Sequence, residues 1–207
     1  MGKSEKDQAI LQAAASVFLT HGFSATTTDM IQREAGVSKA TMYARFPNKE
    51  ALFMAVVERE CATMFEAFQA IQATPGDIAG MLAEIGMSYL KFLLSPTALA
   101  LFRVVSAEVL RFPDLGPRFY RAGPGVGTAV VARRLSEAAR AGEIDVQWVG
   151  VDTAASLFLG MVRAEGHLEC LTHPDARPSA VQMERWVQVA VSTFLRAFGV
   201  ASASPVR

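Results

Sequence analysis

Apolar residues recur every three or four positions along almost the whole chain, which is the spacing that gathers them on one face of a helix. One such stripe runs from Ile10 to Leu19, and a longer one runs from Phe53 to Ile71. The alternation of apolar and polar residues that marks a half-buried strand is nearly absent. The pattern therefore predicts an all-α protein.

Capping and turn residues divide these stripes into about nine predicted helices. Ser4-x-x-Asp7 and Thr26-x-x-Asp29 are capping-box patterns, in which a hydroxyl and a carboxylate satisfy free backbone amides. Further starts are predicted at Ser38, Asn48, Thr74, Ser95, Asp152 and Ser179, another helix at about 124–141, and breaks at Pro47, Pro113, Gly116 and Pro117. These signals predict a compact three-helix domain at residues 1–47 and a larger helical domain at residues 48–207.

Composition excludes several classes of protein. Of the 207 residues, 51% are hydrophobic and 19% are charged, which excludes an intrinsically disordered chain. Lys+Arg 20 balances Asp+Glu 20, so the chain is not uniformly basic, and 2 cysteines are too few for a disulfide scaffold. No apolar run approaches the roughly 18 residues that span a bilayer, and the N-terminus lacks the apolar core of a signal peptide. We expect a cytoplasmic protein without a membrane partner.

Two short helices are predicted on either side of Ala35-Gly36-Val37-Ser38, which is the layout of a helix-turn-helix. Residues 36–49 contain Lys39, Arg45 and Lys49 and no acidic residue, although the whole chain has a formal net charge of +0. In a helix-turn-helix the second helix enters the major groove of DNA. The local positive charge is therefore placed where phosphates would attract it.

The string HGFSATTTDMIQREAGVSKATMYARFPNKEALF, within residues 9–56, resembles the DNA-binding domain of TetR-family regulators without a gap. Residues 102–120, FRVVSAEVLRFPDLGPRFY, resemble the ligand-binding half of the AefR-like subgroup. The resemblance implies a homodimeric repressor, not an enzyme, that needs no cofactor. Such a dimer reads an inverted-repeat operator in double-stranded DNA and is released by a small-molecule effector. The sequence does not separate such a repressor from an activator or from a DNA-binding protein that has no effector.

The resemblance also implies which residues contact DNA. Thr27 and Thr28 would meet a phosphate, and Tyr43 would place its phenol on another. Lys39, Ala40 and Thr41 would lie in the groove, with Lys39 within reach of guanine O6 and N7. Arg45 would reach a base or a phosphate, and Lys49 would bind a phosphate at the positive end of the long helix. Packing is the alternative for Tyr43, and helix capping is the alternative for Thr27.

Apolar side chains on the last two predicted helices exceed what one core face can hide, which suggests a four-helix dimer interface. The candidates on the helix at about 153–173 are Leu157, Phe158, Met161 and Val162. Those on the helix at about 180–198 are Trp186, Ala190, Phe194 and Phe198. Burial inside a monomer is the alternative for these residues.

An effector pocket is expected beside the long helix, because a shift of that helix would move the recognition helix. Its apolar candidates are Met64, Phe65, Phe68, Met87, Tyr89, Phe102, Phe112 and Tyr120, with Arg103 and Glu165 to orient a polar group. These materials suit an apolar or aromatic small molecule. Core packing, or surface pairing for the two charged residues, is the alternative.

A possible metal site is suggested by His167, Cys170 and His173, and it supports the alternative of a helical-bundle enzyme or metal-binding protein. On a helix these three positions drift across the face over nearly two turns, which is wide for one ion. The carboxylate-rich ligand spacing of helical-bundle metal sites is missing. We therefore expect no metal.

Overall fold

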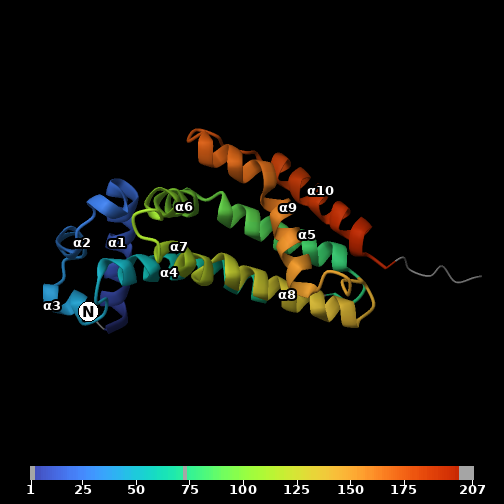
Figure 1. Ribbon diagram of the computed structural model, residues 1–207, viewed down its shortest axis with the longest axis horizontal. Coiled ribbons are helices and arrows are strands. Elements are labelled where there is room, and N and C mark those ends of the chain that lie inside the picture. Colours follow the sequence, from blue (N-terminus) through green and yellow to red (C-terminus); the bar gives the residue numbers. More distant parts are fainter. Residues whose placement is uncertain (1–2, 72–73, 201–207) are drawn as a thin grey trace, which may run out of the picture. The chain divides into compact units, whose positions relative to one another are not determined.

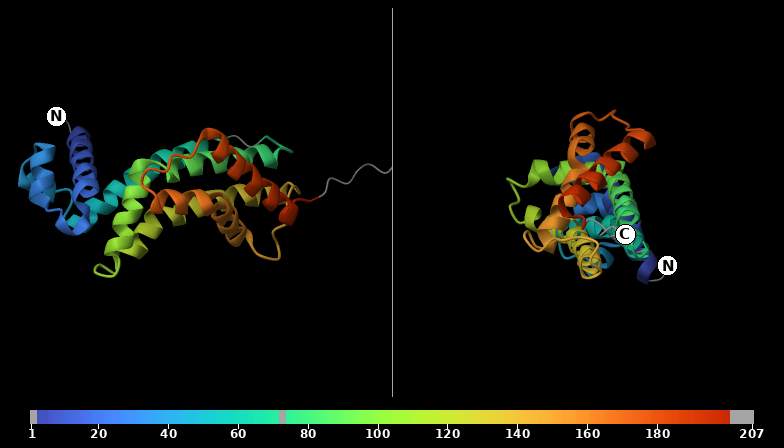
Figure 2. Two further views of the ribbon diagram at one scale, coloured as in Figure 1. Left: turned by 90° about the horizontal axis from the view of Figure 1, so that it is seen from above. Right: turned by 90° about the vertical axis from the view of Figure 1, so that its right-hand side faces the viewer.

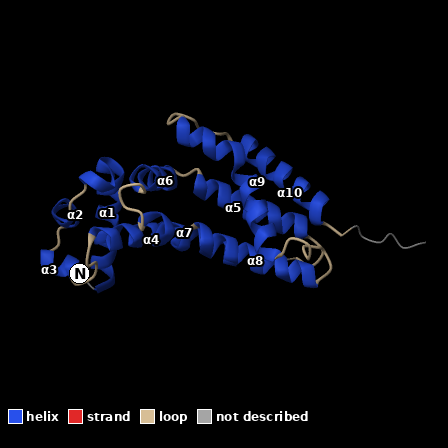
Figure 3. Ribbon diagram, viewed as in Figure 1, coloured by secondary structure: helices blue, strands red, loops and turns tan. Residues whose placement is uncertain are grey.

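The computed structural model describes residues 3–71 and 74–200, apart from the side chains of Lys3, Ser4, Thr63 and Glu165. All regular secondary structure in these residues is helical, as the colouring of Figure 3 shows. The prediction of an all-α protein is confirmed.

Ten helices follow one another along the described chain, one more than the sequence predicts (Figure 1). The first four are α1 (Lys3–Ala25), α2 (Thr28–Ala35), α3 (Lys39–Tyr43) and α4 (Lys49–Ala70). The middle three are α5 (Ile78–Leu93), α6 (Pro96–Glu108) and α7 (Leu115–Ala122). The last three are α8 (Pro124–Arg140), α9 (Val151–Thr172) and α10 (Ala180–Phe198).

Three of the predicted caps form as the sequence indicates. Ser38 Oγ accepts the amide of Thr41, and Asn48 Oδ1 accepts the amide of Ala51 at 2.7 Å. Ser179 completes a capping box, in which the Gln182 side chain accepts the Ser179 amide. These polar side chains satisfy amides that have no partner within the helix, and they fix where α3, α4 and α10 begin.

Other predicted starts are wrong. Ser4 lies inside α1 rather than before it. The cap of α2 is Thr27 and not Thr26, whose hydroxyl instead donates to Gly22 O at 2.6 Å. Asp77 and not Thr74 caps α5, and α9 begins after Gly150, ahead of Asp152. For α2 and α5 a nearby residue with an oxygen-bearing side chain, Thr27 or Asp77, caps the helix instead.

The additional helix is α7, which the sequence presents as a chain break at Gly116 and Pro117. Both residues lie in its first turn. The amides of a first turn have no helical partner, so a proline there removes no hydrogen bond. Gly22, in contrast, has a φ of 75° that interrupts the helical backbone within α1.

The chain divides into two compact units. Their limits lie at other positions than the domain boundary that the sequence predicts between residues 47 and 48. The first comprises Met1–Thr63 and Pro96–Gly125, and therefore contains α1–α3, most of α4, α6 and α7. The second comprises Met64–Ser95 and Val126–Arg207, with α5, α9, α10 and nearly all of α8. Helix α4 begins in the first unit and ends in the second.

Aromatic rings form the centre of the first unit. Phe23 is fully buried and stacks on Phe18 with ring centroids 5.7 Å apart. It also meets Phe53 and Phe112 edge to face, at 5.4 and 5.0 Å. Rings at these separations add attraction beyond the apolar area that they bury. The cluster joins α1 and α4 to the segment that follows α6.

The second unit is held by the packing of α5, α9 and α10, and Figure 2 shows the last two connected helices, in orange and red. Phe158 and Phe194 are fully buried and meet edge to face at 5.5 Å. Gly86 permits a close approach of α5, because a Cβ there would lie 2.9 Å from Val187 Cγ1. The predicted apolar stripes on α9 and α10 thus face a shared core.

Within the described residues no single helix is both long and apolar enough to cross a membrane.

Candidate nucleic-acid interface

The turn between α2 and α3 leaves few backbone groups unsatisfied. Gly36 adopts a φ of 63°, a left-handed conformation that glycine reaches without steric penalty. Its amide donates to Arg33 O, and the amide of Val37 donates to Gln32 O at 3.3 Å. These bonds satisfy the last carbonyls of α2, and Ser38 then starts α3. The three residues between the helices make the tight connection that a helix-turn-helix requires.

Helix α3 is anchored on one side and open on the other. Met42 is 1% exposed and holds the helix to the core of the first unit. Lys39 and Ala40 are exposed, and Tyr43 is 39% exposed. Thr41 is half-buried, and its hydroxyl lies 2.8 Å from Ser38 Oγ. The predicted base-reading residues therefore stand on a short helix whose buried side fixes their direction.

Two polar contacts connect the beginning of α2 to α3. Lys39 Nζ lies 3.3 Å from Asp29 Oδ1 and 5.9 Å from the centroid of the Tyr43 ring. The Tyr43 hydroxyl lies 2.9 Å from Thr28 Oγ1. The exposed side chains of the two helices thus form one connected polar surface.

Thr27 caps α2 and is exposed to solvent. Its hydroxyl accepts the amide of Met30 at 3.2 Å, which is the capping role that the sequence left as an alternative. The residue is nevertheless exposed, at the amino end of α2, where backbone amides and the helix dipole favour an anion. A phosphate contact through Thr27 stays a prediction.

Arg45 has an acidic partner within the chain, and its contact with DNA stays a prediction. Its guanidinium forms a two-oxygen ion pair with Asp7 of α1, and its side chain is only 17% exposed. Both contacts come from Nη1, so one nitrogen meets both carboxylate oxygens. This charge-assisted contact connects the segment that follows α3 to α1.

Lys49 also has partners within the chain. Its ammonium donates to the carbonyls of Phe23 at 2.8 Å, Thr26 at 3.0 Å and Ser24 at 3.3 Å. It also lies 4.6 Å from the centroid of the Phe23 ring. An ammonium group has three protons, and here each has a carbonyl partner. Lys49 therefore satisfies carbonyls at the end of α1, and its phosphate contact stays a prediction.

The residue next to these carbonyls is held by α6, a contact that the sequence did not indicate. Ser24 donates to the Glu108 carboxylate twice, from Oγ at 2.6 Å and from its amide at 3.0 Å. Arg111 donates to Ser24 Oγ at 3.1 Å. The carbonyl end of α1 is thus fixed on one side by Lys49 and on the other by the end of α6. Only the folded chain brings residues 84 positions apart into this junction.

Family models match both parts of the chain. Residues 10–56 match the model described as bacterial regulatory proteins of the tetR family, and residues 80–200 match that of the AefR-like transcriptional repressor C-terminal domain. The chain belongs to the TetR family. It is a DNA-binding transcriptional regulator, and the helix-turn-helix of this TetR-family chain lies within the residues 10–56 that match the tetR-family model.

Solved structures and curated proteins agree with this assignment. A TetR-family regulator from Mesorhizobium loti has 27% identity and a TM-score of 0.85, with 97% of this chain and 100% of that chain covered. The flavonoid-responsive regulator FrrA has 31% identity and a TM-score of 0.81, with 96% and 100% covered. The Escherichia coli regulator RutR is 45% identical over 56 residues, which span 27% of this chain and 26% of RutR.

The residues predicted for an effector pocket are divided between the two units. Met64 and Phe68 are buried in the core of the second unit, and Phe65, Met87 and Tyr89 pack partly buried against that core. Burial raises the pKa of Tyr89 above its ordinary value, and the nearby Arg163 opposes that rise. The others lie in the first unit: Phe102, Arg103, Phe112 and Tyr120. The side chain of Glu165 lies outside the description.

Phe112 has a structural partner, since its ring packs on Phe23. Phe102 lies 6.3 Å from Phe119, and Tyr120 is 58% exposed. The pocket therefore stays a prediction for most of its residues, whereas Phe112 is part of the aromatic cluster that supports the helix-turn-helix.

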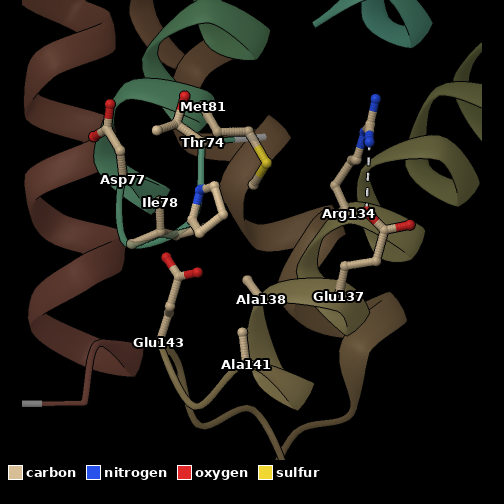
Figure 4. A pocket seen from close by; sticks show the side chains of 10 residues that line it. Thr74, Asp77, Ile78, Met81, Arg134, Glu137, Ala138, Ala141 and Glu143 are labelled. Atoms are coloured by element: carbon tan, nitrogen blue, oxygen red, sulfur yellow. Dashed lines mark hydrogen bonds and ion pairs between the residues drawn. The ribbon is translucent and has the colours of Figure 1, made fainter. Parts of the chain in front are cut away.

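A different cavity, of about 190 Å³, lies between the start of α5 and the end of α8 in the second unit (Figure 4). Arg134, which lines the cavity, donates a hydrogen bond to Ile71 O at 2.7 Å and so caps the end of α4. Asp77 accepts the amide of Gly80, and Glu143 accepts the amide of Gly76 at 3.3 Å. Glu137, the remaining charged residue of the lining, forms an ion pair with Arg134 at 3.4 Å. The charged groups around the cavity thus have partners within the chain, and none of them is a predicted pocket residue.

The predicted dimer residues divide into buried and surface groups. Phe158, Val162, Ala190, Phe194 and Phe198 are at most 5% exposed within the single chain, so they have almost no surface left for a partner. Leu157 is 46% exposed, and Met161 and Trp186 line an open groove of about 800 Å³ between α9 and α10. Periodicity did not indicate which apolar side chains of α9 and α10 face outward, and the dimer interface stays a prediction.

No group of three or more potential metal ligands lies together in the described part of the chain. His167 and Cys170 are buried at 5% and 2% exposure, whereas His173 ends α9 in an exposed position. The separation that the helical spacing predicted for these residues keeps His173 away from the other two. The alternative of a metal-binding protein based on this set has no support here.

His167 instead gives a pH dependence of stability. Burial, with a smaller contribution from the positive charge of Arg163, lowers its pKa from 6.5 to about 4. The unfolded chain then binds a proton between pH 6.5 and about 4 that the folded chain does not bind, so stability is lost as the pH falls through this range. We expect His167→Gln to remove about 2 kcal/mol of the difference in unfolding free energy between pH 7 and pH 4.5.

Urea unfolding of the two proteins at both pH values measures this difference. The exposed His173 supplies the control, since His173→Gln should keep the wild-type pH dependence. An equal loss of stability in wild type and His167→Gln would assign the pH dependence to other groups.

Proposed function

We propose that this TetR-family regulator is a dimeric repressor that leaves an inverted-repeat operator when a small aromatic molecule binds. The observation that carries the DNA-reading part is the exposed face of α3, where Lys39, Ala40 and Tyr43 project from a helix anchored by Met42. Repression is supported by the match of residues 80–200 to a repressor C-terminal domain.

An aromatic effector is supported by composition and by one relative. The predicted lining in the second unit combines Phe65, Met87 and the partly buried phenol of Tyr89. Such surfaces suit a flat apolar molecule with a few polar groups. FrrA, whose structure aligns with 96% of this chain, is by its name responsive to flavonoids. We therefore place the effector among hydroxylated aromatic compounds of that kind.

Dimerisation is supported by apolar surface on the last two helices. Leu157 and Leu168 of α9 are 46% and 64% exposed, and Val181 and Val189 of α10 are 73% and 59% exposed. Large apolar side chains gathered on adjacent helices are typical of a protein interface. A two-fold dimer through α9 and α10 would cover them and would present two copies of α3 to DNA.

The DNA-binding step is tested by selection of bound duplexes from a random pool, followed by footprinting on the chain's own upstream DNA. We expect an inverted repeat whose half-sites are about one helical turn apart or slightly more. A reporter placed behind that sequence should be silent with the regulator and active without it. A reporter that requires the regulator would overturn the repressor role and leave DNA binding intact.

The dimer gives a separate prediction. Val189→Glu places a charge in the groove between α9 and α10 without touching the buried core, so it should convert the protein into a monomer at micromolar concentration. Light scattering measures the mass. Leu110→Glu is the matched control, since Leu110 is 93% exposed in the other unit, and this variant should stay dimeric. A monomeric wild type would show that the interface is wrong.

The effector step is tested by calorimetry with naringenin, a flavonoid probe, in the presence and absence of operator. A ligand shifts an equilibrium only through different affinities for the two states. If naringenin releases DNA, operator must weaken its binding by the same factor. Equal affinities in both titrations would refute the coupling for this compound class.

A further inference from the structure

Asp29 is an acidic residue on the surface that is proposed to meet DNA. It lies in the first turn of α2, and its carboxylate contacts Lys39, the first residue of α3, at 3.3 Å. Both side chains are open to solvent, at 55% exposure for Asp29 and 61% for Lys39. Because Lys39 is also beside the Tyr43 ring, the carboxylate stands next to the groove-facing side of α3.

An exposed ion pair of this kind contributes little to folding, so stability alone gives no strong reason for it. Near DNA the carboxylate would be repelled by phosphates unless it finds a hydrogen-bond donor. The donors that the major groove offers are the amino groups of cytosine and adenine. Asp29 therefore carries a base preference that Lys39 alone would lack.

The spacing of the pair suits one base pair in particular. Guanine O6 and cytosine N4 are hydrogen-bonded to each other, so an acceptor and a donor lie side by side in the major groove about 3 Å apart. Lysine donates to guanine O6 and N7, and a carboxylate accepts from cytosine N4. Lys39 Nζ and Asp29 Oδ1 lie 3.3 Å apart, so the lysine can donate to guanine O6 while the carboxylate accepts from cytosine N4.

We propose that Asp29 is a specificity-determining residue, and that the Asp29–Lys39 pair reads one G·C base pair in each half-site. Lys39 faces the guanine, and Asp29 accepts a hydrogen bond from the N4 amino group of the paired cytosine. The inference rests on the proposed reading of operator DNA by α3. It adds that α2 reads a base too, and that an acidic residue, not a basic one, does so.

The experiment begins with duplexes selected by the wild-type protein, and it locates the base pair whose guanine preference is lost in Lys39→Met. Affinities of wild type and Asp29→Ala are then measured for four duplexes that differ only there. A fifth duplex carries 2-pyrimidinone, which lacks the N4 amino group, in place of the cytosine. Glu34→Gln is the matched control, because Glu34 is an exposed acid of the same helix, about 140° further around its axis.

We expect wild type and Glu34→Gln to prefer the G·C duplex by about 5- to 100-fold and to bind the 2-pyrimidinone duplex several-fold more weakly. Asp29→Ala should lose most of the preference for the G·C base pair. It should bind the G·C duplex and the 2-pyrimidinone duplex with equal affinity. Thermal unfolding of Asp29→Ala provides a check that α2 is intact.

Tighter binding of every duplex by Asp29→Ala, by one common factor, would overturn the inference, because Asp29 would then act only by repelling phosphates. Unchanged base preferences in Asp29→Ala, measured on a specific operator, would overturn the inference and leave the proposed function intact. A wild-type protein that selects no duplex would overturn the proposed function as well.

Discussion

Replacement of Lys49 by methionine lowers the free energy of unfolding by about 2–4 kcal/mol, because carbonyls at the end of α1 lose a charged donor. The three acceptors are Phe23, Ser24 and Thr26. Methionine keeps the apolar stem of the side chain, so the effect reports the ammonium group. Urea unfolding followed by circular dichroism measures it.

The control for this variant is Lys39→Met, which makes the same chemical change in the same unit. Lys39 is exposed and has one ion-pair partner, so its replacement should leave stability within about 0.5 kcal/mol of wild type. A Lys49→Met variant with unchanged stability but altered DNA binding would support the DNA contact that the sequence predicts for Lys49. Unchanged stability in Lys49→Met, with weaker DNA binding and a flatter dependence on salt, would make Lys49 a phosphate contact.

The second large effect is expected for Phe23→Ala, which removes the ring at the centre of the aromatic cluster. Phe23 is fully buried and contacts Phe18, Phe53 and Phe112, and Lys49 lies above its face. Truncation of such a residue costs about 3–5 kcal/mol. Loss of this cluster should release the end of α1 and should abolish DNA binding at temperatures where wild type is folded.

Phe119→Ala is the matched comparison, since Phe119 is half-buried and the centroid of its ring lies 6.3 Å from that of Phe102. Its cost should be clearly smaller than that of Phe23→Ala. Equal thermal shifts in the two variants would show that the cluster has no special place in the unit.

Local signals along the chain were sufficient to predict the helix-turn-helix. Gly36 and Ser38 act through backbone conformation and through a hydrogen bond three residues away, and both effects are visible in a short stretch of sequence. The same holds for the capping box at Ser179. The family resemblance covered the same region, so the fold class and the recognition helix could both be predicted.

The roles of Arg45 and Lys49 could not be predicted, because they depend on partners far away in the sequence. Asp7 is 38 positions from Arg45, and Phe23 is 26 positions from Lys49. A cluster of basic residues indicates a charge that DNA would attract, but it does not show which charges are already used within the fold. Lys39 remains available, since its one ion pair is exposed.

The dimer residues show a similar limit. Helical spacing identifies Phe158 and Phe194 as members of an apolar stripe, but it does not distinguish the chain's own core from a partner's surface. Their burial at 0% exposure assigns them to the core, whereas Leu157 and Val189 remain on the surface. This distinction requires the packing of α5 against α9 and α10, which no local pattern contains.

The central claim is that the exposed face of α3 reads a specific DNA sequence. The most direct measurement is fluorescence anisotropy of the selected duplex and of a scrambled duplex of equal composition, titrated with wild type and with Lys39→Met. We expect wild type to bind the selected duplex at least about a thousandfold more tightly than the scrambled one. Lys39→Met should lose much of this ratio while its stability stays unchanged. Equal binding of both duplexes by the folded wild-type protein would contradict the claim.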